Sequence, residues 1–391
     1  MKSRNIIFIV LMFLILFVCE LGFVRVEKNI SFAENRTLQK FEHFTFISYL
    51  EGTYQKKLES ALSDQFIGGE TIKQELKSIL NFTDYNNIPE RLCKNKYLNL
   101  DGSFFTYNCN HDLIVKYDEL TKEARANINS RLEVYSKLNN YIDTYYYFLS
   151  TPSIFDFEKN EYHINIIDYI KKNLKGNYNL ASLEFKNYEE YKKLFYKTDH
   201  HWNYYGSYIA YTQIADMFND NQNIIKPVET VTFDDIVFYG SRSRISQIFD
   251  YKELFTVYKF NFPEFTVIND KLYDKYGNEE NYFQGKYNRS KLTNHYGEFY
   301  GEDSGEVIFD FNDNDKDNLL VLGSSYTNAI NKLIASHFNK TYVIDLRHYE
   351  EKIGEKFNIK SYIEENSIDK VLIIADYSFL INGSFNIDWS K

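Results

Sequence analysis

One stretch predicts the fold: Leu319-Leu320-Val321-Leu322-Gly323-Ser324-Ser325-Tyr326-Thr327. Four consecutive apolar residues are typical of a buried strand, and the glycine and two serines that follow are typical of a turn. Apolar residues then recur at helical spacing over residues 327–337, which predicts a helix. A strand, a turn and a helix in this order form the unit from which parallel α/β sheets are built.

The same alternation continues on both sides of this stretch. Strands are predicted at 145–149, 180–185, 342–345 and 370–375, and helices at 118–141, 161–174, 189–194, 204–218 and 359–365. Strands that alternate with helices predict right-handed βαβ units, and therefore a mainly parallel sheet covered on both faces. We expect a three-layer α/β/α domain. Residues 219–317 show only short aromatic strands, such as 255–262, between many turn signals.

Composition excludes several classes of protein. Among 391 residues, hydrophobic residues are 44% and charged residues 26%, as in globular proteins and unlike disordered chains. The net charge is −10 without a basic block, which argues against nucleic-acid binding. Aromatic residues make up 18% of the chain, which fits the codon bias of an AT-rich genome, so tyrosine content alone does not indicate a carbohydrate site.

The N-terminus has the pattern of an export signal. Lys2 and Arg4 precede an apolar run at 6–18, which resumes briefly at 21–24, and no small-residue cleavage site follows. We predict an uncleaved signal anchor at 1–24 rather than a removed signal peptide, with the rest of the chain outside the cytoplasmic membrane. A helical lead segment is predicted at 25–95 and the α/β domain at 96–391.

Two cysteines flank a predicted hairpin. Asp101-Gly102 lies between two apolar runs, which is a strong hairpin signal, and a two-residue turn there would pair Leu100 with Ser103. Continued outward, this pairing brings Cys93 and Cys109 nearly opposite each other. Outside the membrane they could form a disulfide, and two free buried thiols are the alternative.

The candidate catalytic groups lie in Asp199-His200-His201-Trp202 and at Ser325. A serine hydroxyl becomes a nucleophile when a base removes its proton, and the base needs a partner that fixes its tautomer. In an extended segment Asp199 and His201 share a face and His200 points away, so we expect His201 to be the base. The alternatives are that Asp199 caps the following helix and that the histidines are buried structural residues.

A metal site and an oxyanion site were considered beside this pair. Asp199, His200 and His201 are metal-ligand types, but three consecutive residues rarely converge on one ion, so no metal is expected. Gly240-Ser241, after an aromatic strand, could offer backbone N–H groups to an oxyanion or could be only a turn. Parallel strands end at one rim, where the next strand places Arg347 and Tyr349.

Asp199-His200-His201-Trp202 resembles the signature of the DHHW family, which is similar to the alginate O-acetylation proteins of the SGNH-hydrolase-like superfamily. Other segments occur in the order which that family shows, from about residue 30 to 380: Glu34-Asn35-Arg36 with Phe41, Asp64-Gln65-Phe66, the glycine hairpin, Gly323-Ser324-Ser325-Tyr326, Asp345-Leu346-Arg347-His348-Tyr349 and Ile368-Asp369-Lys370-Val371-Leu372. There are departures: Ser324 stands where many members have Asp, Gly68-Gly69 where an Arg is usual, and Asp303 where an Asn is frequent.

The resemblance implies an extracytoplasmic O-acetyltransferase that acts on a polysaccharide. Ser325 would be the nucleophile, His201 the base and Asp199 its orienting partner. Arg347 and Tyr349 would border the pocket, and Trp202, Gly240 and Ser241 are further pocket candidates. A membrane-bound O-acyltransferase is the implied partner, and no cofactor is expected. An acetyl esterase with the same residues and a non-catalytic polymer-binding scaffold are the alternatives.

We predict that the protein stays in the membrane fraction with residues 1–24 attached, because a basic start and an apolar run without a cleavage site act as an anchor. Fractionation followed by N-terminal sequencing tests this. A soluble mature form that begins near Val26 would contradict it.

Overall fold

The computed structural model describes residues 30–31, 36–66, 75–76, 96–97, 104–106, 112–115, 119–246, 248–249, 253–273 and 276–389. The chain divides into two compact units. The smaller unit comprises Met1–Leu113, Ser241–Tyr251 and Ser290–Thr293, and the larger comprises Ile114–Gly240, Lys252–Arg289 and Asn294–Lys391. Each unit is described by itself. The boundary predicted between residues 95 and 96 stays a prediction.

The larger unit is built on an eight-stranded sheet of order β13-β12-β14-β16-β15-β17-β6-β9. The strands are β6 (Asp143–Leu149), β9 (Asn179–Leu183), β12 (Thr266–Asn269), β13 (Leu272–Tyr273), β14 (Glu306–Asp310), β15 (Leu319–Leu322), β16 (Lys340–Ile344) and β17 (Lys370–Ala375). Strands β16, β15, β17, β6 and β9 are parallel, whereas β14, β12 and β13 extend the sheet antiparallel at one edge.

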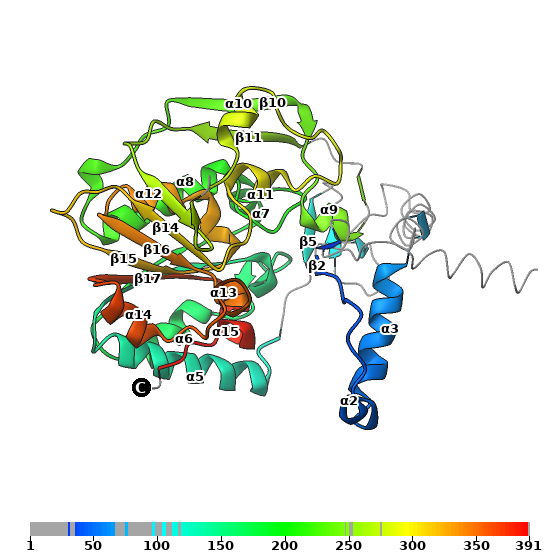
Figure 1. The fold of residues 1–391 in the computed structure, drawn as a ribbon. Coiled ribbons are helices and arrows are strands. Elements are labelled where there is room, and N and C mark those ends of the chain that lie inside the picture. Colours follow the sequence, from blue (N-terminus) through cyan, green and yellow to red (C-terminus); the bar gives the residue numbers. More distant parts are fainter. Residues whose placement is uncertain are drawn as a thin grey trace, which may run out of the picture. The chain divides into compact units, whose positions relative to one another are not determined.

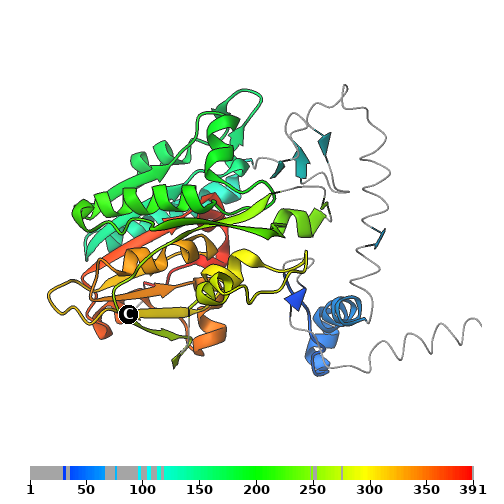
Figure 2. The same ribbon diagram turned by 90° about the horizontal axis from the view of Figure 1, so that it is seen from above.

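Helices cover both faces of this sheet (Figures 1 and 2). One layer contains α5 (Lys122–Leu138), α6 (Ile166–Asn173), α13 (Leu346–Ile353), α14 (Ile359–Glu365) and α15 (Tyr377–Ile381). The opposite layer contains α7 (Tyr188–Leu194), α8 (Tyr204–Met217), α11 (His295–Tyr300) and α12 (Asn331–Ala335). The predicted three-layer α/β/α architecture with a mainly parallel sheet is thus confirmed.

Strand β15 lies inside the parallel part of the sheet, between β16 and β17. All four of its side chains are fully buried. Leu320 and Leu322 belong to the large apolar cluster formed with the α5 layer, and the alternation of a strand turns Leu319 and Val321 toward the other layer. Burial on both faces explains why this strand is a continuous apolar run.

Three predicted elements differ from the structure. The helix expected at 327–337 is divided into a 3-10 turn, η4 (Ser325–Ala329), and α12, because the turn already begins at Ser325. The helix expected at 161–174 begins only at α6, where Asn165 caps it, and its first residues form β8 (Glu161–Tyr162) against β7 (Phe155–Asp156). Helix α13 was not predicted at all, and the Asp345 side chain caps its start.

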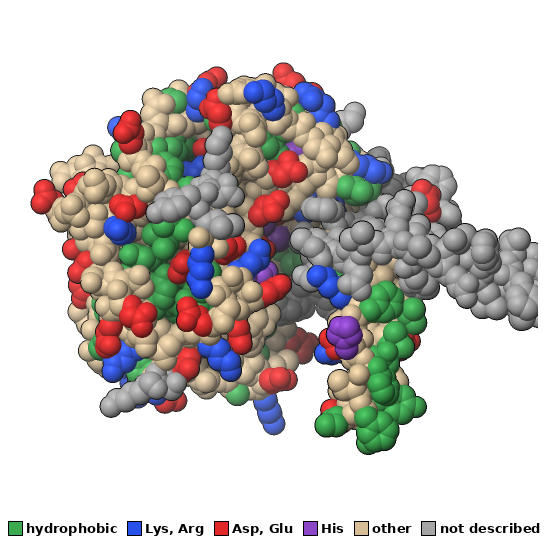
Figure 3. Space-filling model, in the orientation of Figure 1, with side chains coloured by type: hydrophobic (Ala, Val, Ile, Leu, Met, Phe, Trp, Pro, Cys, Tyr) green, Lys and Arg blue, Asp and Glu red, His purple; other side chains and the backbone are tan. Residues whose placement is uncertain are grey.

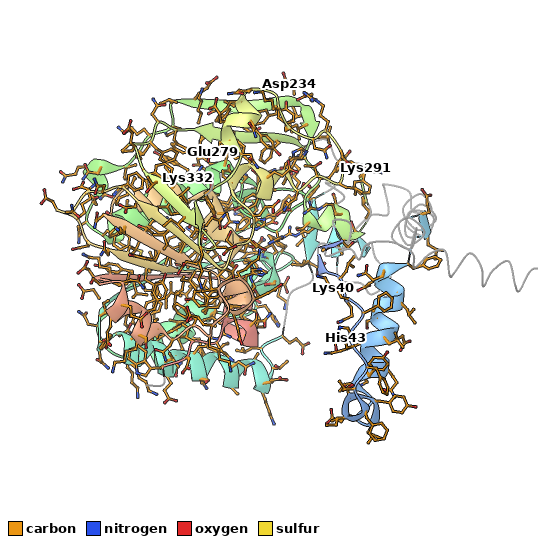
Figure 4. All side chains as sticks on the ribbon, in the orientation of Figure 1. Lys40, His43, Asp234, Glu279, Lys291 and Lys332 are labelled. Carbon is orange, nitrogen blue, oxygen red and sulfur yellow. The ribbon has the colours of Figure 1, made fainter. Side chains whose placement is uncertain are left out.

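A two-stranded ribbon covers the α8 and α11 side of the larger unit. It consists of β10 (Glu229–Val237) and β11 (Leu254–Lys259), with α10 (Glu279–Phe283) beside it. Phe233, Phe255 and Tyr282 pack with Phe299 in a separate aromatic cluster. Lys332 of α12 forms an ion pair of 2.9 Å with Glu279 of α10 (Figure 4). Short turns η2 (Pro152–Ile154), η3 (Asn221–Asn223) and η5 (Gly383–Phe385) complete the unit.

The smaller unit contains a helical hairpin and short strands. These are α2 (Phe46–Leu50), α3 (Thr53–Gln65), α9 (Ser241–Ser246), β1 (Ile30–Ser31), β2 (Arg36–Thr37), β3 (Lys96–Tyr97) and β4 (Phe104–Thr106), with β5 (Leu113–Val115) at the boundary with the larger unit. Figure 3 shows hydrophobic side chains gathered along α2 and α3.

The hairpin predicted around Asp101-Gly102 is supported by the antiparallel pairing of β3 with β4. Tyr97 pairs with Phe105, one residue away from the register expected of a two-residue turn. Cys93 and Cys109 lie outside the described residues, so their disulfide stays a prediction. The apolar run at 6–24 also lies outside them, and among the helices that the structure describes none is long and apolar enough to cross a bilayer.

Candidate active site

The Asp-His-His-Trp segment forms a turn between α7 and α8. Phe195 and Trp202 form an antiparallel bridge, and the Tyr196 N–H donates to the His201 carbonyl at 3.3 Å. The Asn203 side chain then caps α8, accepting from two N–H groups of its first turn at 3.0 Å. The chain therefore reverses direction here, and the reversal presents Asp199 and His201 on one side.

Asp199 and His201 form a short hydrogen bond inside this turn. Asp199 Oδ1 lies 2.6 Å from His201 Nδ1 and also accepts from the His201 backbone N–H at 2.9 Å. Both side chains are buried. Burial by itself raises the pKa of Asp199, but the charges of His201 and His200 and the hydrogen bonds from His201 lower it further, so that the net pKa is well below its usual value. Asp199 therefore remains a carboxylate.

Ser325 completes a chain of contacts with these two residues. His201 Nε2 lies 2.9 Å from Ser325 Oγ, so the imidazole lies between the carboxylate and the hydroxyl. Ser325 is half-buried at the carboxyl end of β15. Gly323 is needed for the turn because an added Cβ would lie 2.3 Å from the Thr327 side chain. The structure thus brings Ser325 to His201, which lies 124 positions earlier in the sequence, and to Asp199 beside it.

Two tyrosines fix the His201 imidazole relative to the turn that carries Ser325. The Tyr296 ring stacks on His201 at a centroid distance of 3.9 Å and an angle of 9°. Its hydroxyl lies 3.2 Å from the Ser325 carbonyl, to which it donates. Tyr326 donates to the His200 carbonyl at 2.7 Å and packs edge-on against His201. Tyr296 and Tyr326 therefore each connect the Asp-His-His-Trp turn to the turn that carries Ser325.

Gly240 forms a turn, which is one of the two roles that the sequence allowed. Its N–H donates at 3.0 Å to the Thr198 hydroxyl, which in turn donates to the Phe238 carbonyl. That N–H is therefore not available to an oxyanion, and the turn interpretation holds. A Cβ at Gly240 would lie 2.3 Å from the Asp199 Cβ and 2.4 Å from its Oδ2. Ser241 begins α9 in the smaller unit, so its place in the site stays a prediction.

The prediction that His200 points away from Asp199 is wrong. Its Nδ1 lies 3.5 Å from Asp199 Oδ1, and its ring lies 3.8 Å from that of His201. The expectation assumed an extended strand, whereas the residues form a turn that brings neighbouring side chains together. His200 nevertheless differs from His201, because its side chain is 38% exposed and that of His201 only 7%.

Trp202 and Tyr349 were predicted to line the pocket, and the structure places both in the core. Trp202 is completely buried and packs edge-on against Tyr326. Tyr349 is 5% exposed and contacts Phe357 and Tyr362 in the cluster on the α5 side. Tyr349 points into the core because it lies on helix α13, which the sequence did not predict, while Arg347 remains at the rim.

Charged residues form this rim of the sheet. Arg347 binds Asp345 through two nitrogens, at 3.0 and 2.5 Å, and burial offset by this carboxylate leaves the pKa of Arg347 raised. Asp303 Oδ2 lies 3.6 Å from both Arg347 Nη2 and His348 Nε2. Partial burial of the Asp303 side chain, which is 40% exposed, raises its pKa, but the contact with His348 and the charges of Arg347 and His201 lower it more. Asp303 therefore interacts mainly with Arg347 and His348 at the rim.

Asp199, His200 and His201 could also hold a metal ion, since one ligand atom from each lies within 4.8 Å of the others. In the observed arrangement, however, Asp199 Oδ1 is bound to His201 Nδ1, and His201 Nε2 faces Ser325 Oγ. Both ring nitrogens of His201 are thus engaged, Nδ1 by the carboxylate and Nε2 by the hydroxyl. This pattern fits proton transfer better than metal ligation.

Two site residues were not found from the sequence. Tyr296 lies in the region 219–317 that showed no clear pattern, and nothing in its neighbours distinguishes it from the other tyrosines. Asp303 was noted only as a departure from the family pattern. Its place in a short loop before β14 was the available signal, because reactive groups of α/β sheets gather in loops at strand ends.

No family profile matches this sequence, and no curated protein sequence does so significantly. Solved structures do match. A DHHW family protein from Eubacterium siraeum has a TM-score of 0.53 at 20% identity, covering 74% of this chain and 96% of its own. Bacillus cereus PatB1 with a sulfonyl adduct has a TM-score of 0.54 at 20% identity, covering 71% and 96%. The resemblance to the DHHW family is thus confirmed, and at this identity it concerns the fold.

A third match is weaker. Pseudomonas aeruginosa AlgX has a TM-score of 0.33 at 10% identity, covering 69% of this chain and 60% of its own. That superposition is too loose to carry an argument about this chain.

We predict that Gly240→Ala disrupts the contact between Asp199 and His201, because the new methyl group would overlap Asp199. The low-field NMR signal of the proton on His201 Nδ1 should shift or disappear, since a short charge-assisted hydrogen bond produces it. Gly383→Ala is the matched control, because an added Cβ there meets nothing nearer than 3.9 Å. An unchanged signal in Gly240→Ala would show that the turn does not depend on this close approach.

Proposed function

We propose that this protein is an extracytoplasmic O-acetyltransferase that acts on a polysaccharide through Ser325, His201 and Asp199. The single observation that carries the proposal is the position of His201, with Asp199 Oδ1 at 2.6 Å on one side and Ser325 Oγ at 2.9 Å on the other. A carboxylate, an imidazole and a hydroxyl in this order are the parts of an activated serine nucleophile.

The two half-reactions follow from these contacts. Ser325 Oγ attacks the carbonyl carbon of an acetyl donor while His201 Nε2 takes its proton, and the donor's leaving group departs with that proton. The acetyl group is then an ester on Ser325. A sugar hydroxyl attacks this ester, His201 accepts the hydroxyl proton, and Ser325 leaves and regains a proton from His201. Asp199 stays ionised and stabilises the imidazolium in both steps.

An oxyanion forms in each half-reaction and needs donors. Ser325 is the first residue of η4, and the first N–H groups of a helical turn have no partner within that turn. The Ser325 N–H is therefore the donor that we propose for the oxyanion, in place of Gly240.

The same experiment distinguishes two alternative functions, an esterase and a polymer-binding scaffold. An esterase would use the same three residues and admit water as the acceptor, and a polymer-binding scaffold would not use them. The short buried contacts favour a reactive serine over a scaffold, since a decayed site has no need to keep a carboxylate buried beside an imidazole. The sulfonyl adduct in PatB1 provides a matching probe, because sulfonyl fluorides react with activated hydroxyl groups.

The location and partner belong to this proposal. Residues 1–24 would anchor the chain with its larger unit outside the cytoplasmic membrane, where acetyl-CoA is not available. A membrane-bound O-acyltransferase would therefore deliver the acetyl group.

A strip of half-buried aromatic residues supports a polysaccharide substrate. Tyr204 opens α8 three residues after His201, and its ring lies 4.8 Å from Tyr258 of β11. Tyr208 lies 5.5 Å from Tyr258 and stacks on Phe260 at 5.9 Å. Ring contacts continue through Phe262, Phe265 and Phe311. Pyranose rings have apolar C–H faces that pack on aromatic rings, so a sugar chain could follow this strip away from Ser325.

We predict that Ser325→Ala and His201→Ala each lower the initial rate on a chromogenic acetyl ester by about 10³-fold or more, because the members of a triad act as a unit. Asp199→Asn should lose about 10²-fold or more, since the imidazole then loses the partner that fixes its tautomer. His200→Ala should stay within about tenfold of the parent, because its contact with His201 is packing rather than proton transfer. Initial rates of the purified full-length chain and its variants measure this.

The controls use the neighbouring serine and the acceptor. Phenylmethylsulfonyl fluoride should label Ser325 of the parent, as shown by peptide mass spectrometry, and Ser324→Ala should not prevent labelling. Polymer-bound acetyl in the presence of polysaccharide indicates transfer, whereas release of acetate alone indicates the esterase. A Ser325→Ala variant that keeps its rate and a parent that resists the reagent would together refute the mechanism.

We predict that Tyr258→Ala raises the KM for polymer about 2- to 12-fold, which corresponds to about 0.5–1.5 kcal/mol of lost ring contact, and leaves the rate on the small ester unchanged. Tyr141→Ala is the matched control, because this exposed tyrosine packs on Trp389 at the opposite helical layer. Equal effects of Tyr258→Ala on polymer and small ester would show that the strip does not bind the sugar chain.

A further inference from the structure

The hairpin of α2 and α3 ends in a tip that is held rigidly by its own stem. The segment before α2 runs back along α3: the Gln39 N–H donates to Asp64 at 2.9 Å, and Lys57 pairs with Glu42 at 2.7 Å. Nearest the tip, the Phe44 ring packs edge-on against Tyr54 at 5.3 Å. These contacts follow in order along the stem, so residues 44–50, here called the hairpin tip, are presented in one defined position.

The hairpin tip exposes large apolar side chains on one surface. Phe46, Ile47 and Leu50 are 67%, 70% and 69% exposed, and no residue of α2 is buried. Their spacing places them on one face of the helix. Phe44 and Tyr49 flank this face at 58% and 48%. Figure 3 shows the hydrophobic atoms continuous over the end of the hairpin. A contiguous apolar surface of this kind marks an interaction site.

Several polar groups of the hairpin tip are satisfied within the hairpin. The Thr45 and Ser48 hydroxyls lie 2.6 Å apart, and Ser48 Oγ also donates to the Thr45 carbonyl at 2.9 Å. The last carbonyls of α2 accept from side chains at the start of α3, from Thr53 to Ser48 and from Gln55 to Tyr49, each at 3.0 Å. A segment whose hydrogen bonds are already made can leave water at low cost.

Charge is absent from α2 and begins at its borders. Lys40, Glu42 and His43 lie on the segment that leads into the tip, and Glu51 follows α2 directly. Figure 4 labels Lys40 and His43 on this segment. An uncharged aromatic and aliphatic end with charged residues behind it is the pattern of segments that lie in the boundary between lipid headgroups and acyl chains.

The sequence before the hairpin supplies a bilayer within reach. The apolar run that we predict to be an anchor ends at Val24, twenty residues before Phe44. An extended chain of that length spans at most about 70 Å, so an anchored chain keeps the tip near the same membrane. We propose that the hairpin tip inserts into the interfacial layer of the membrane that carries the N-terminal run, as a second contact that orients the protein on the bilayer.

Ile47→Trp in the full-length chain tests this proposal. In vesicles of phosphatidylcholine, the emission of the added tryptophan should shift to shorter wavelength, and brominated phosphatidylcholine should quench it about twofold or more. Spectra of the parent, which contains Trp202 and Trp389, are subtracted. Ser63→Trp is the matched control: it is exposed on α3, about 15 Å along that helix from its first residue next to the tip, and it should not be quenched.

Contact of the hairpin tip with protein or with water, instead of lipid, gives a different result in this experiment. An Ile47→Trp emission that is shifted in vesicles but not quenched by brominated phosphatidylcholine would place the tip against protein, either a second copy or the rest of the chain, and overturns the proposal. Emission typical of water in the vesicles overturns it as well. Labelling of Ser325 by the sulfonyl fluoride reports the fold of each variant, and a Ser325→Ala chain should keep the lipid contact, so this inference and the proposed function can fail separately.

Discussion

The site depends on one buried interaction, the hydrogen bond between the Asp199 carboxylate and His201 Nδ1. A carboxylate that is fully removed from water without partners would be strongly destabilising, and removing one partner of a buried pair costs about 3–5 kcal/mol. Asp199 tolerates burial because the backbone and the side chain of His201 both donate to the same oxygen. The two contacts fix the turn and the imidazole together, so the geometry of the base is part of the local fold.

The surrounding structure then has to leave room for this arrangement and bring the serine to it. Gly240 provides the room, because any larger residue would overlap Asp199. The sheet provides the serine, because β15 ends where η4 begins. Tyr296 connects the turn that carries His201 with the turn that carries Ser325, because it stacks on His201 and donates to the Ser325 carbonyl. Rigid elements thus support each member of the site, which is the condition for precise placement of reacting groups.

The sequence was sufficient for those features that depend on local patterns. Strand 319–322 and helix 359–365 were predicted with their observed limits, because a buried parallel strand is a pure apolar run and an amphipathic helix has a clear period. The orientation of His200 and Tyr349 could not be predicted, because it depends on whether a few residues form a turn, a strand or a helix. Tyr296 was invisible for a further reason: stacking on His201 is a tertiary contact made from a region without a period.

Electrostatics around the base can be understood from the same contacts. In the proposed mechanism His201 carries a positive charge after it accepts a proton, and Asp199 stabilises that charge at hydrogen-bond distance. Asp303 is a further carboxylate near the site, and the charge of His201 is the smallest of the influences that lower its pKa. Arg347 and His348 lie 3.6 Å from Asp303, so the basic side chains of the rim offset part of this charge. An asparagine at position 303 would carry no charge for them to offset, so the aspartate and the basic side chains beside it form one electrostatic unit.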